Sequence, residues 1–221
     1  MGRLLLALAF ICLGSGASAW AQSAREAYVD GAFLEAASLG EAQGQADDLA
    51  LAADRSNTEA RLQLAAAIGM RGRRATIAEA MRKGYAGEGR ALVRAAIVEA
   101  PREAWAHALE GGWNLEVVRR GGGVGAAYYG ASVRAGHAAF ERARALAPDD
   151  AIIAYQYAVA LLELDPERYG AEAARLLAAA SACRPADAFE TRVKAKAASV
   201  ATVLSARGPD AAVRLATARF R

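Results

Sequence analysis

The stretch GHAAFERARALAPDDAIIAYQYAVALLEL, residues 136–164, decides the fold of this chain. Phe140, Ala143 and Ala147 follow the spacing i, i+3, i+7, so a helix carries all three on one face. Pro148 cannot continue that helix, and either residue of the Asp pair after it can cap the next one. The stretch therefore predicts two helices joined by a tight turn.

The composition extends this prediction to the whole chain. Of 221 residues, 61 are Ala, 24 are Arg and only 3 are Lys, and 55% of the chain is hydrophobic. Because Ala has the highest helix propensity and β-branched residues are scarce, we expect an all-α protein without a sheet core. Charged residues make up 23% and the net charge is only +3, which argues against disorder and, since the Arg residues are dispersed, against nucleic-acid binding.

The N-terminus has the pattern of a secretory signal peptide over residues 1–21. Arg3 precedes an apolar core, residues 4–13, which is about half of the ~20 residues that a membrane-spanning helix needs. Small residues occupy the positions that a signal peptidase recognises, in either of two frames that share Ala19. The preference for Ala, Gly and Arg indicates a GC-rich bacterial genome. We therefore expect a periplasmic or secreted mature chain with no membrane span.

The closing pattern of the first helix in the opening stretch recurs on both sides of it. Each of the three copies is followed by an expected helix start, at residues 104, 151 and 188. An earlier helix, TEARLQLAAAIGM, is expected to start at residue 58. The two further copies are Gly89, Val93, Ala96 and Pro101 upstream, and Ala173, Leu177, Ala180 and Pro185 downstream.

The spacing small-xxx-Phe-xx-Ala-xxxx-Pro, carried by Gly136, Phe140, Ala143 and Pro148, resembles the second helix of a tetratricopeptide repeat (TPR). Together with the segment LEGGWNLEVVRRGGGVGAAYYGASVRAG before it, the chain is similar to the regulator-of-microtubule-dynamics type of TPR protein. This resemblance covers roughly residues 55–205. It implies an all-α, right-handed superhelical array of antiparallel helix pairs (an α-solenoid) that serves as a partner-binding scaffold; the microtubule role does not carry over to an exported protein.

The expected organisation follows from these helix starts. Residues 22–57 are a degenerate repeat that caps the array, and residues 207–221, after the break at Gly208-Pro209, form a C-terminal capping helix. The TPR-like repeats occupy residues 58–206, divided into 58–103, 104–150, 151–187 and a half repeat, 188–206.

The residue types and spacings for catalysis or metal binding are missing from the sequence. His107 and His137 are thirty residues apart and have no Cys, Asp or Glu at metal-ligand spacing on a shared helix face. No Walker-type, zinc-protease or nucleophile-elbow motif occurs. Cys183 is the single Cys left after signal cleavage, so an internal disulfide is excluded. We expect a protein that is not an enzyme and that has no cofactor and no metal.

One glycine-rich segment, RRGGGVGAAYYG at residues 119–130, leaves an alternative open. Its glycines are expected to end the helix that begins at residue 104 and to form an elbow, with Tyr128 and Tyr129 packing the insertion back onto the array. In the alternative, Arg119 and Arg120 face an anion at the next helix N-terminus. The protein would then be a ligand- or anion-binding protein, or an enzyme, that uses this insertion.

The favoured function is protein–protein interaction on a concave face. In a stacked array the first helix of each unit lines that face, where a peptide or protein partner with an acidic end would dock. The alternative for any of these residues is packing between units. The sequence leaves the partner and the oligomeric state open. The predicted groove residues are Trp105, Ala108, Leu115, Ile152, Tyr155, Val159, Leu162, Arg192 and Lys196.

Overall fold

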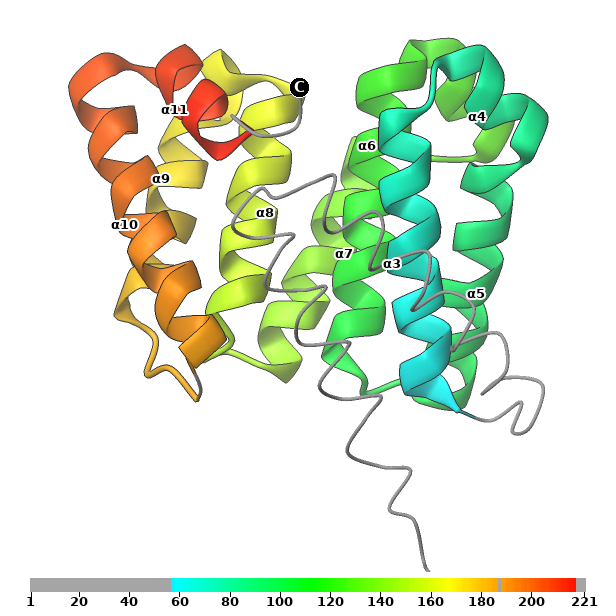
Figure 1. The fold of residues 1–221 in the computed structure, drawn as a ribbon, viewed down its shortest axis with the longest axis horizontal. Helices are drawn as coiled ribbons and strands as arrows, with labels where there is room; N and C mark the ends of the chain where they lie inside the picture. The colour runs from blue at the N-terminus through cyan, green and yellow to red at the C-terminus, as the bar shows by residue number, and fades with distance from the viewer. Residues whose placement is uncertain (1–56, 187, 218–221) are drawn as a thin grey trace, which may run out of the picture.

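The computed structural model describes residues 57–186 and 188–217, and within them the chain forms nine helices and no strand (Figure 1). The expected signal peptide and N-terminal capping helices lie outside this described part, as do residues 187 and 218–221. None of the helices described is both long and apolar enough to cross a membrane. The helices are α3 (Thr58–Arg74), α4 (Ile77–Lys83), α5 (Tyr85–Glu99), α6 (Ala104–Tyr129), α7 (Val133–Leu146), α8 (Ala151–Leu164), α9 (Pro166–Ala182), α10 (Ala188–Arg207) and α11 (Pro209–Ala216).

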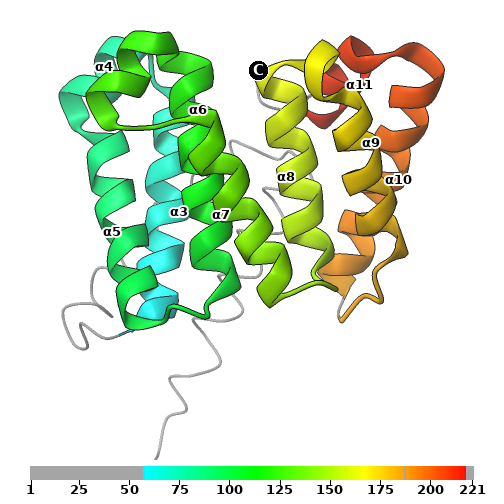
Figure 2. The ribbon, with the colours of Figure 1, turned by 180° about the vertical axis from the view of Figure 1, so that it is seen from behind.

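The helices pack as adjacent antiparallel pairs in chain order (Figures 1 and 2). α3 lies against α5, with the short α4 between them in sequence, and α6 lies against α7. α8 lies against α9, and α10 packs on both α9 and α11. Contacts between α6 and α8, and between α5 and α6, join one pair to the next. The predicted all-α class and the antiparallel pairing are confirmed.

The predicted helix starts are also confirmed. Capping residues at the helix ends show why a local sequence pattern predicts such starts. Asp150 is the N-cap of α8: its Oδ1 accepts hydrogen bonds from the backbone N–H groups of Ile152, at 2.8 Å, and Ile153, at 3.0 Å. Gly208, with φ 82°, separates α10 from α11, and Pro209 is the first residue of α11. The four helices predicted to begin repeats do begin at Thr58, Ala104, Ala151 and Ala188.

Two glycines bring α6 and α7 unusually close together. A Cβ on Gly111 would lie 2.5 Å from a ring carbon of Phe140, and a Cβ on Gly136 would lie 2.5 Å from a methyl carbon of Leu115. No real side chain tolerates such distances, so each large residue fills the space that the glycine opposite leaves open. The small positions of the sequence pattern therefore determine how closely this pair packs.

The main core is centred on α8. Ten of its fourteen residues are buried, and its Tyr157 stacks on Phe140 of α7 with ring centroids 4.5 Å apart. The buried cluster around it extends from Ala108 in α6 to Ala216 in α11. A second, small cluster joins α3, α5 and α6 and consists of Leu62, Ala96 and Ala106. Apolar packing is therefore densest in the C-terminal half of the described chain.

The glycine-rich insertion breaks the helix at Gly122, where two helical segments of α6 meet at a kink. Gly122 has φ 56° and ψ −155°, a conformation open essentially only to glycine, and the helix resumes beyond it to Tyr129. Because of this kink the edge of the Tyr129 ring packs against Trp113, with centroids 6.2 Å apart, whereas Tyr128 is 74% exposed. The glycines therefore end the first helical segment and form the expected elbow, and one of the two tyrosines packs the insertion back.

Candidate functional site

The described helices surround a cavity of about 560 Å³ that opens to the surface. Residues of α3, α4, α5, α6, α8 and α10, with Phe140 of α7, line it. Most lining residues are apolar, aromatic or small, and volumes in this range are typical of ligand-binding clefts. This cavity is the candidate functional site.

Small residues on facing helices leave the space, and aromatic rings enclose it. A Cβ on Gly69 of α3 would meet no heavy atom within 4 Å, so the lining is open at this point. Trp105 and Trp113 of α6 line the same cavity and are two of the three tryptophans in the chain. The small lining residues include Ala65, Ala66, Gly69 and Gly72 of α3, Ala108 and Gly112 of α6, and Ala160 of α8.

A cluster of ion pairs joins α3, α6 and α8 at the cavity. Arg73 lies 2.5 Å from Glu163 and 3.2 Å from Glu116, while Arg119 donates hydrogen bonds of 2.9 and 2.7 Å to the two oxygens of Glu116. Burial alone would raise the pKa of Glu116, but the charges and hydrogen bonds of Arg73 and Arg119 outweigh burial and lower that pKa to about 2. Glu116 is therefore ionised at neutral pH, and these charges compensate one another.

The structure brings together five of the nine predicted groove residues. Tyr155 and Leu162 are 4% and 0% exposed and do not line the cavity. Arg192 and Lys196 lie on α10, partly exposed, and are not among the residues that line the cavity. The predicted basic end of the groove is therefore not part of this cavity. The five that line it are Trp105, Ala108, Leu115, Ile152 and Val159.

The two arginines considered for an anion site also line the cavity, but their donors point at protein acceptors. Arg119 holds Glu116, as described above. Arg120 donates to the backbone carbonyls of Gly72 and Ala75, the latter at 2.7 Å. These carbonyls lie at the C-terminal end of α3, where a cation is favoured. Both side chains thus attach the insertion to the fold.

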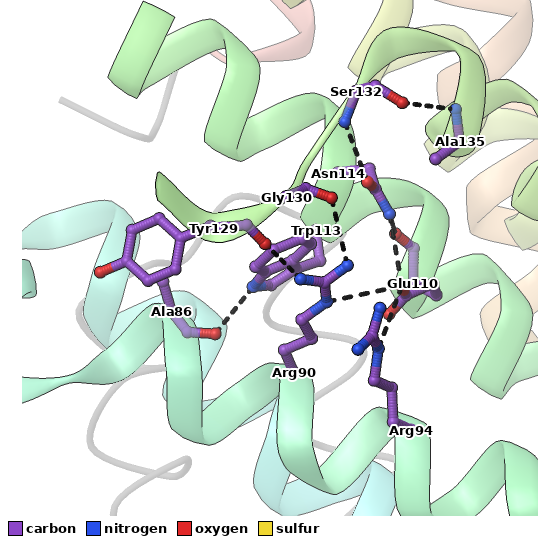
Figure 3. A network of polar contacts seen from close by, with 10 residues as sticks. All are labelled: Ala86, Arg90, Arg94, Glu110, Trp113, Asn114, Tyr129, Gly130, Ser132 and Ala135. Atoms are coloured by element: carbon purple, nitrogen blue, oxygen red, sulfur yellow. Dashed lines mark hydrogen bonds and ion pairs between the residues drawn. The ribbon is translucent and has the colours of Figure 1, made fainter. Parts of the chain in front are cut away.

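A second polar network holds the insertion from its other side (Figure 3). Arg90 of α5 donates to the carbonyls of Tyr129 and Gly130, and its guanidinium carbon lies 4.1 Å from the centre of the Trp113 ring. The Trp113 indole N–H donates to the carbonyl of Ala86 at 2.8 Å. These contacts attach the end of α6, at Tyr129 and Gly130, to α5. Sequence reasoning did not single out Arg90 or Trp113, because their partners are distant in sequence.

The two histidines have structural contacts. A ring nitrogen of His107 lies 2.9 Å from the carbonyl oxygen of Pro101, and His137 Nδ1 lies 2.5 Å from the hydroxyl of Tyr157. Tyr157 donates to Glu172 at 3.3 Å, and burial followed by this carboxylate raises the pKa of Tyr157. Among the described residues no three His, Cys, Asp or Glu side chains come together as metal ligands.

Sequence reasoning also missed α4, which lines the cavity with Ile77, Ala80 and Met81. A signal for this helix was present: Thr76 and Glu79 have the S/T-x-x-E spacing of a capping box. In the structure the Thr76 hydroxyl accepts a 3.2 Å hydrogen bond from the backbone N–H of Glu79. The capping box therefore marks a helix that the repeat pattern did not contain.

No protein-family model matches this chain, and neither the curated proteins nor the solved structures contain a significantly similar chain.

Proposed function

We propose that this protein is an exported, TPR-like scaffold that binds an apolar segment of a partner polypeptide in the cavity. The observation that carries the proposal is the predominantly apolar, open cavity of about 560 Å³, which is enclosed by aromatic rings and widened by small residues. An apolar groove between helices is suited to the apolar face of a partner helix or strand.

The order of helix contacts supports a TPR-like stack. α3, α6, α8 and α10 begin the pairs, and α3 contacts α6, α6 contacts α8, and α8 contacts α10. Such contacts between first helices are expected where pairs repeat into a right-handed superhelix with a concave face. The cavity is lined mainly by these helices, which is where a repeat scaffold binds its partners.

Export rests on the sequence of residues 1–21 and is consistent with the lone buried thiol. Cys183 is 8% exposed, and its Sγ–H donates to the carbonyl of Ala179 at 3.3 Å. A thiol that packs as a small apolar group suits an oxidising compartment, because it offers no exposed partner for disulfide exchange.

A second candidate function is the binding of a small apolar ligand. The cavity volume supports it, and so does the insertion, since Val124, Tyr128 and Tyr129 line the cavity. The paired state of Arg119 and Arg120 favours an uncharged ligand over an anion.

Gly69→Leu tests the peptide-binding proposal. The new side chain enters the open part of the cavity, and α3 gains helix propensity, so folding is preserved while the site is filled. Gly87→Leu is the matched control, since Gly87 is an exposed helical glycine with open space around its Cβ and does not line the cavity.

The measurement is selection of a displayed peptide library on the purified parent, with binding followed by the fluorescence of Trp105 and Trp113. We expect selected peptides to be apolar, to bind the parent and the Gly87→Leu variant equally, and to bind Gly69→Leu at least tenfold more weakly. Equal binding by Gly69→Leu, or no enrichment on the parent, contradicts the proposal. A different result supports the second candidate: no peptide is enriched, but the parent binds a small apolar dye saturably and Gly69→Leu abolishes that binding.

A further inference from the structure

Four large apolar side chains are exposed at one end of the molecule. Ile77 and Met81 on α4 are 52% and 55% exposed, and Val124 and Tyr128 on the last turns of α6 are 85% and 74% exposed. Both helix segments lie at the same end in the two opposite views (Figures 1 and 2). Each pair has i, i+4 spacing and stands on one face of its helix. We call these four residues the apolar tip.

The helices do not use the tip for packing. α4 has no buried residue, although it is amphipathic and capped at both ends. Ile77, Met81, Val124 and Tyr128 also line the rim of the cavity, so they surround an opening instead of filling it. Exposed apolar side chains gathered at one end of a molecule mark surfaces that meet another apolar phase.

The chain around the tip is strongly basic. Residues 71–83 contain five Arg or Lys residues and a single acid, Glu79, whereas the whole chain has 27 basic and 24 acidic residues. Arg74, Arg82 and Lys83 are exposed, and none of the three has an ion pair with any residue in 57–186 or 188–217. The charge at this end therefore remains available for an anionic surface.

The combination of basic and exposed apolar side chains indicates which class of partner fits this surface. Nucleic acid would match the charge, but a phosphate backbone gives no site for Ile77, Met81 or Val124. An acidic peptide would match the charge, but a peptide in the cavity would leave these side chains, each more than half exposed, largely in water. A bilayer interface accepts isolated protruding apolar side chains, favours Tyr at the headgroup level and attracts Lys and Arg when its lipids are anionic.

We propose that the apolar tip docks on the surface of a bilayer containing anionic phospholipid. Ile77, Met81, Val124 and Tyr128 enter the interface, and Arg74, Arg82 and Lys83 lie among the headgroups. The cavity rim then faces the bilayer. This inference does not depend on what occupies the cavity, because the tip residues act through their exposed side chains.

The test is co-flotation of the purified protein with vesicles of phosphatidylglycerol mixed with phosphatidylcholine, compared with vesicles of phosphatidylcholine alone. We expect the parent to bind the anionic vesicles and to lose binding as salt rises. Arg82→Glu with Lys83→Glu should weaken binding by about tenfold or more, since each basic residue near an anionic surface contributes about fivefold. Ile77→Ser with Met81→Ser should weaken it by about tenfold.

Matched controls change the same residue types elsewhere. Val98 is 80% exposed at the other end of α5, and Arg142 and Arg175 are exposed on α7 and α9. Val98→Ser, and Arg142→Glu with Arg175→Glu, should leave vesicle binding unchanged. All variants share residues 1–56, so any contribution of that segment is common to them. Circular dichroism checks that each variant keeps its helices.

Three outcomes overturn the proposal. One is binding that does not distinguish anionic from neutral vesicles. Another is an equal loss of binding in the control and tip variants. The third is a parent that ignores both kinds of vesicle but binds an acidic amphipathic peptide through Arg82 and Lys83, which would make the tip a protein-docking surface.

Discussion

α8 and α4 come from the same Ala-rich chain and have opposite surroundings. α8 is predominantly apolar, with Gln156 and Glu163 on one face, and buries ten of its fourteen residues, whereas α4 buries none of its seven. α8 is surrounded by α6, α7, α9, α10 and α11, while among the described helices α4 has a single close neighbour, α5. The comparison teaches that the sequence of a short helix does not by itself decide whether the helix is buried, because burial depends on how many elements surround it.

The two halves also differ in what holds them together. Around α8 the contacts are apolar, with Tyr157, Leu161 and Leu177 all 0% exposed. Around α3 and α5 the buried cluster is small, and arginines bridge the helices: Arg61 pairs with Glu99, and Arg73 pairs with Glu116 and Glu163. The N-terminal half thus keeps its helices in place while leaving the cavity open between them.

The largest expected effect contrasts the two helices directly. Leu161→Ala in α8 removes a fully buried side chain and should lower the free energy of unfolding by about 2–5 kcal/mol. Ile77→Ala in α4 should change it by no more than about 0.5 kcal/mol. Urea unfolding followed by circular dichroism measures both. Similar losses for the two variants would show that α4 is packed as tightly as α8, against the comparison drawn here.

Gly111→Ala tests the close packing of α6 on α7. Its Cβ would lie 2.5 Å from the Phe140 ring, so the ring must move, and we expect a loss of about 1–3 kcal/mol despite the higher helix propensity of Ala. Gly87→Ala, at an open helical position, should instead raise stability by up to about 1 kcal/mol. Thermal unfolding of both variants checks the sign. A stabilised Gly111→Ala variant would mean that the two helices separate easily.

The ion pairs of the N-terminal half predict a pH dependence. The pKa of Glu116 falls from 4.5 to about 2 on folding, so its contribution is present above pH 4.5 and is lost as the pH falls towards 2. Glu116→Gln should be less stable than the parent by about 1–2 kcal/mol at neutral pH, and this difference should disappear near pH 2. The control is Glu141→Gln, since Glu141 is 55% exposed and pairs with Arg144 on the same helix. A constant difference between Glu116→Gln and the parent from pH 7 to pH 2 would contradict the assignment.

Tyr157→Phe sharpens the comparison inside the C-terminal core. The stack on Phe140 is retained, while the hydroxyl contacts with His137 and Glu172 are lost. We expect a loss of only about 0.5–1.5 kcal/mol, smaller than that of Leu161→Ala, because apolar packing dominates this half. Chemical denaturation gives the value. A loss above that of Leu161→Ala would identify the polar trio as the main stabilising feature.

The sequence predicted those features that depend on neighbouring residues in the chain. The turn after Pro148 and the cap at Asp150 follow from local backbone chemistry, and the small position at Gly136 follows from the repeat spacing. Tyr155 and Leu162 were predicted to line the groove, but they are buried and do not line the cavity. The signal for their burial was that AIIAYQYAVALLEL has only two strongly polar residues, Gln156 and Glu163, which stand on the face of the helix that lines the cavity.

The helix starts at residues 58, 104, 151 and 188 were determined by sequence alone, because capping, proline geometry and glycine size act within a few residues. The cavity, the arginine contacts to α3 and to the insertion, and the exposure of α4 were decided only by the tertiary structure. They depend on contacts such as that between Arg90 and the carbonyl of Gly130, 40 residues apart, which no local pattern encodes. Whether an apolar face is buried, lines a cavity or meets solvent is determined by the other helices packed around it.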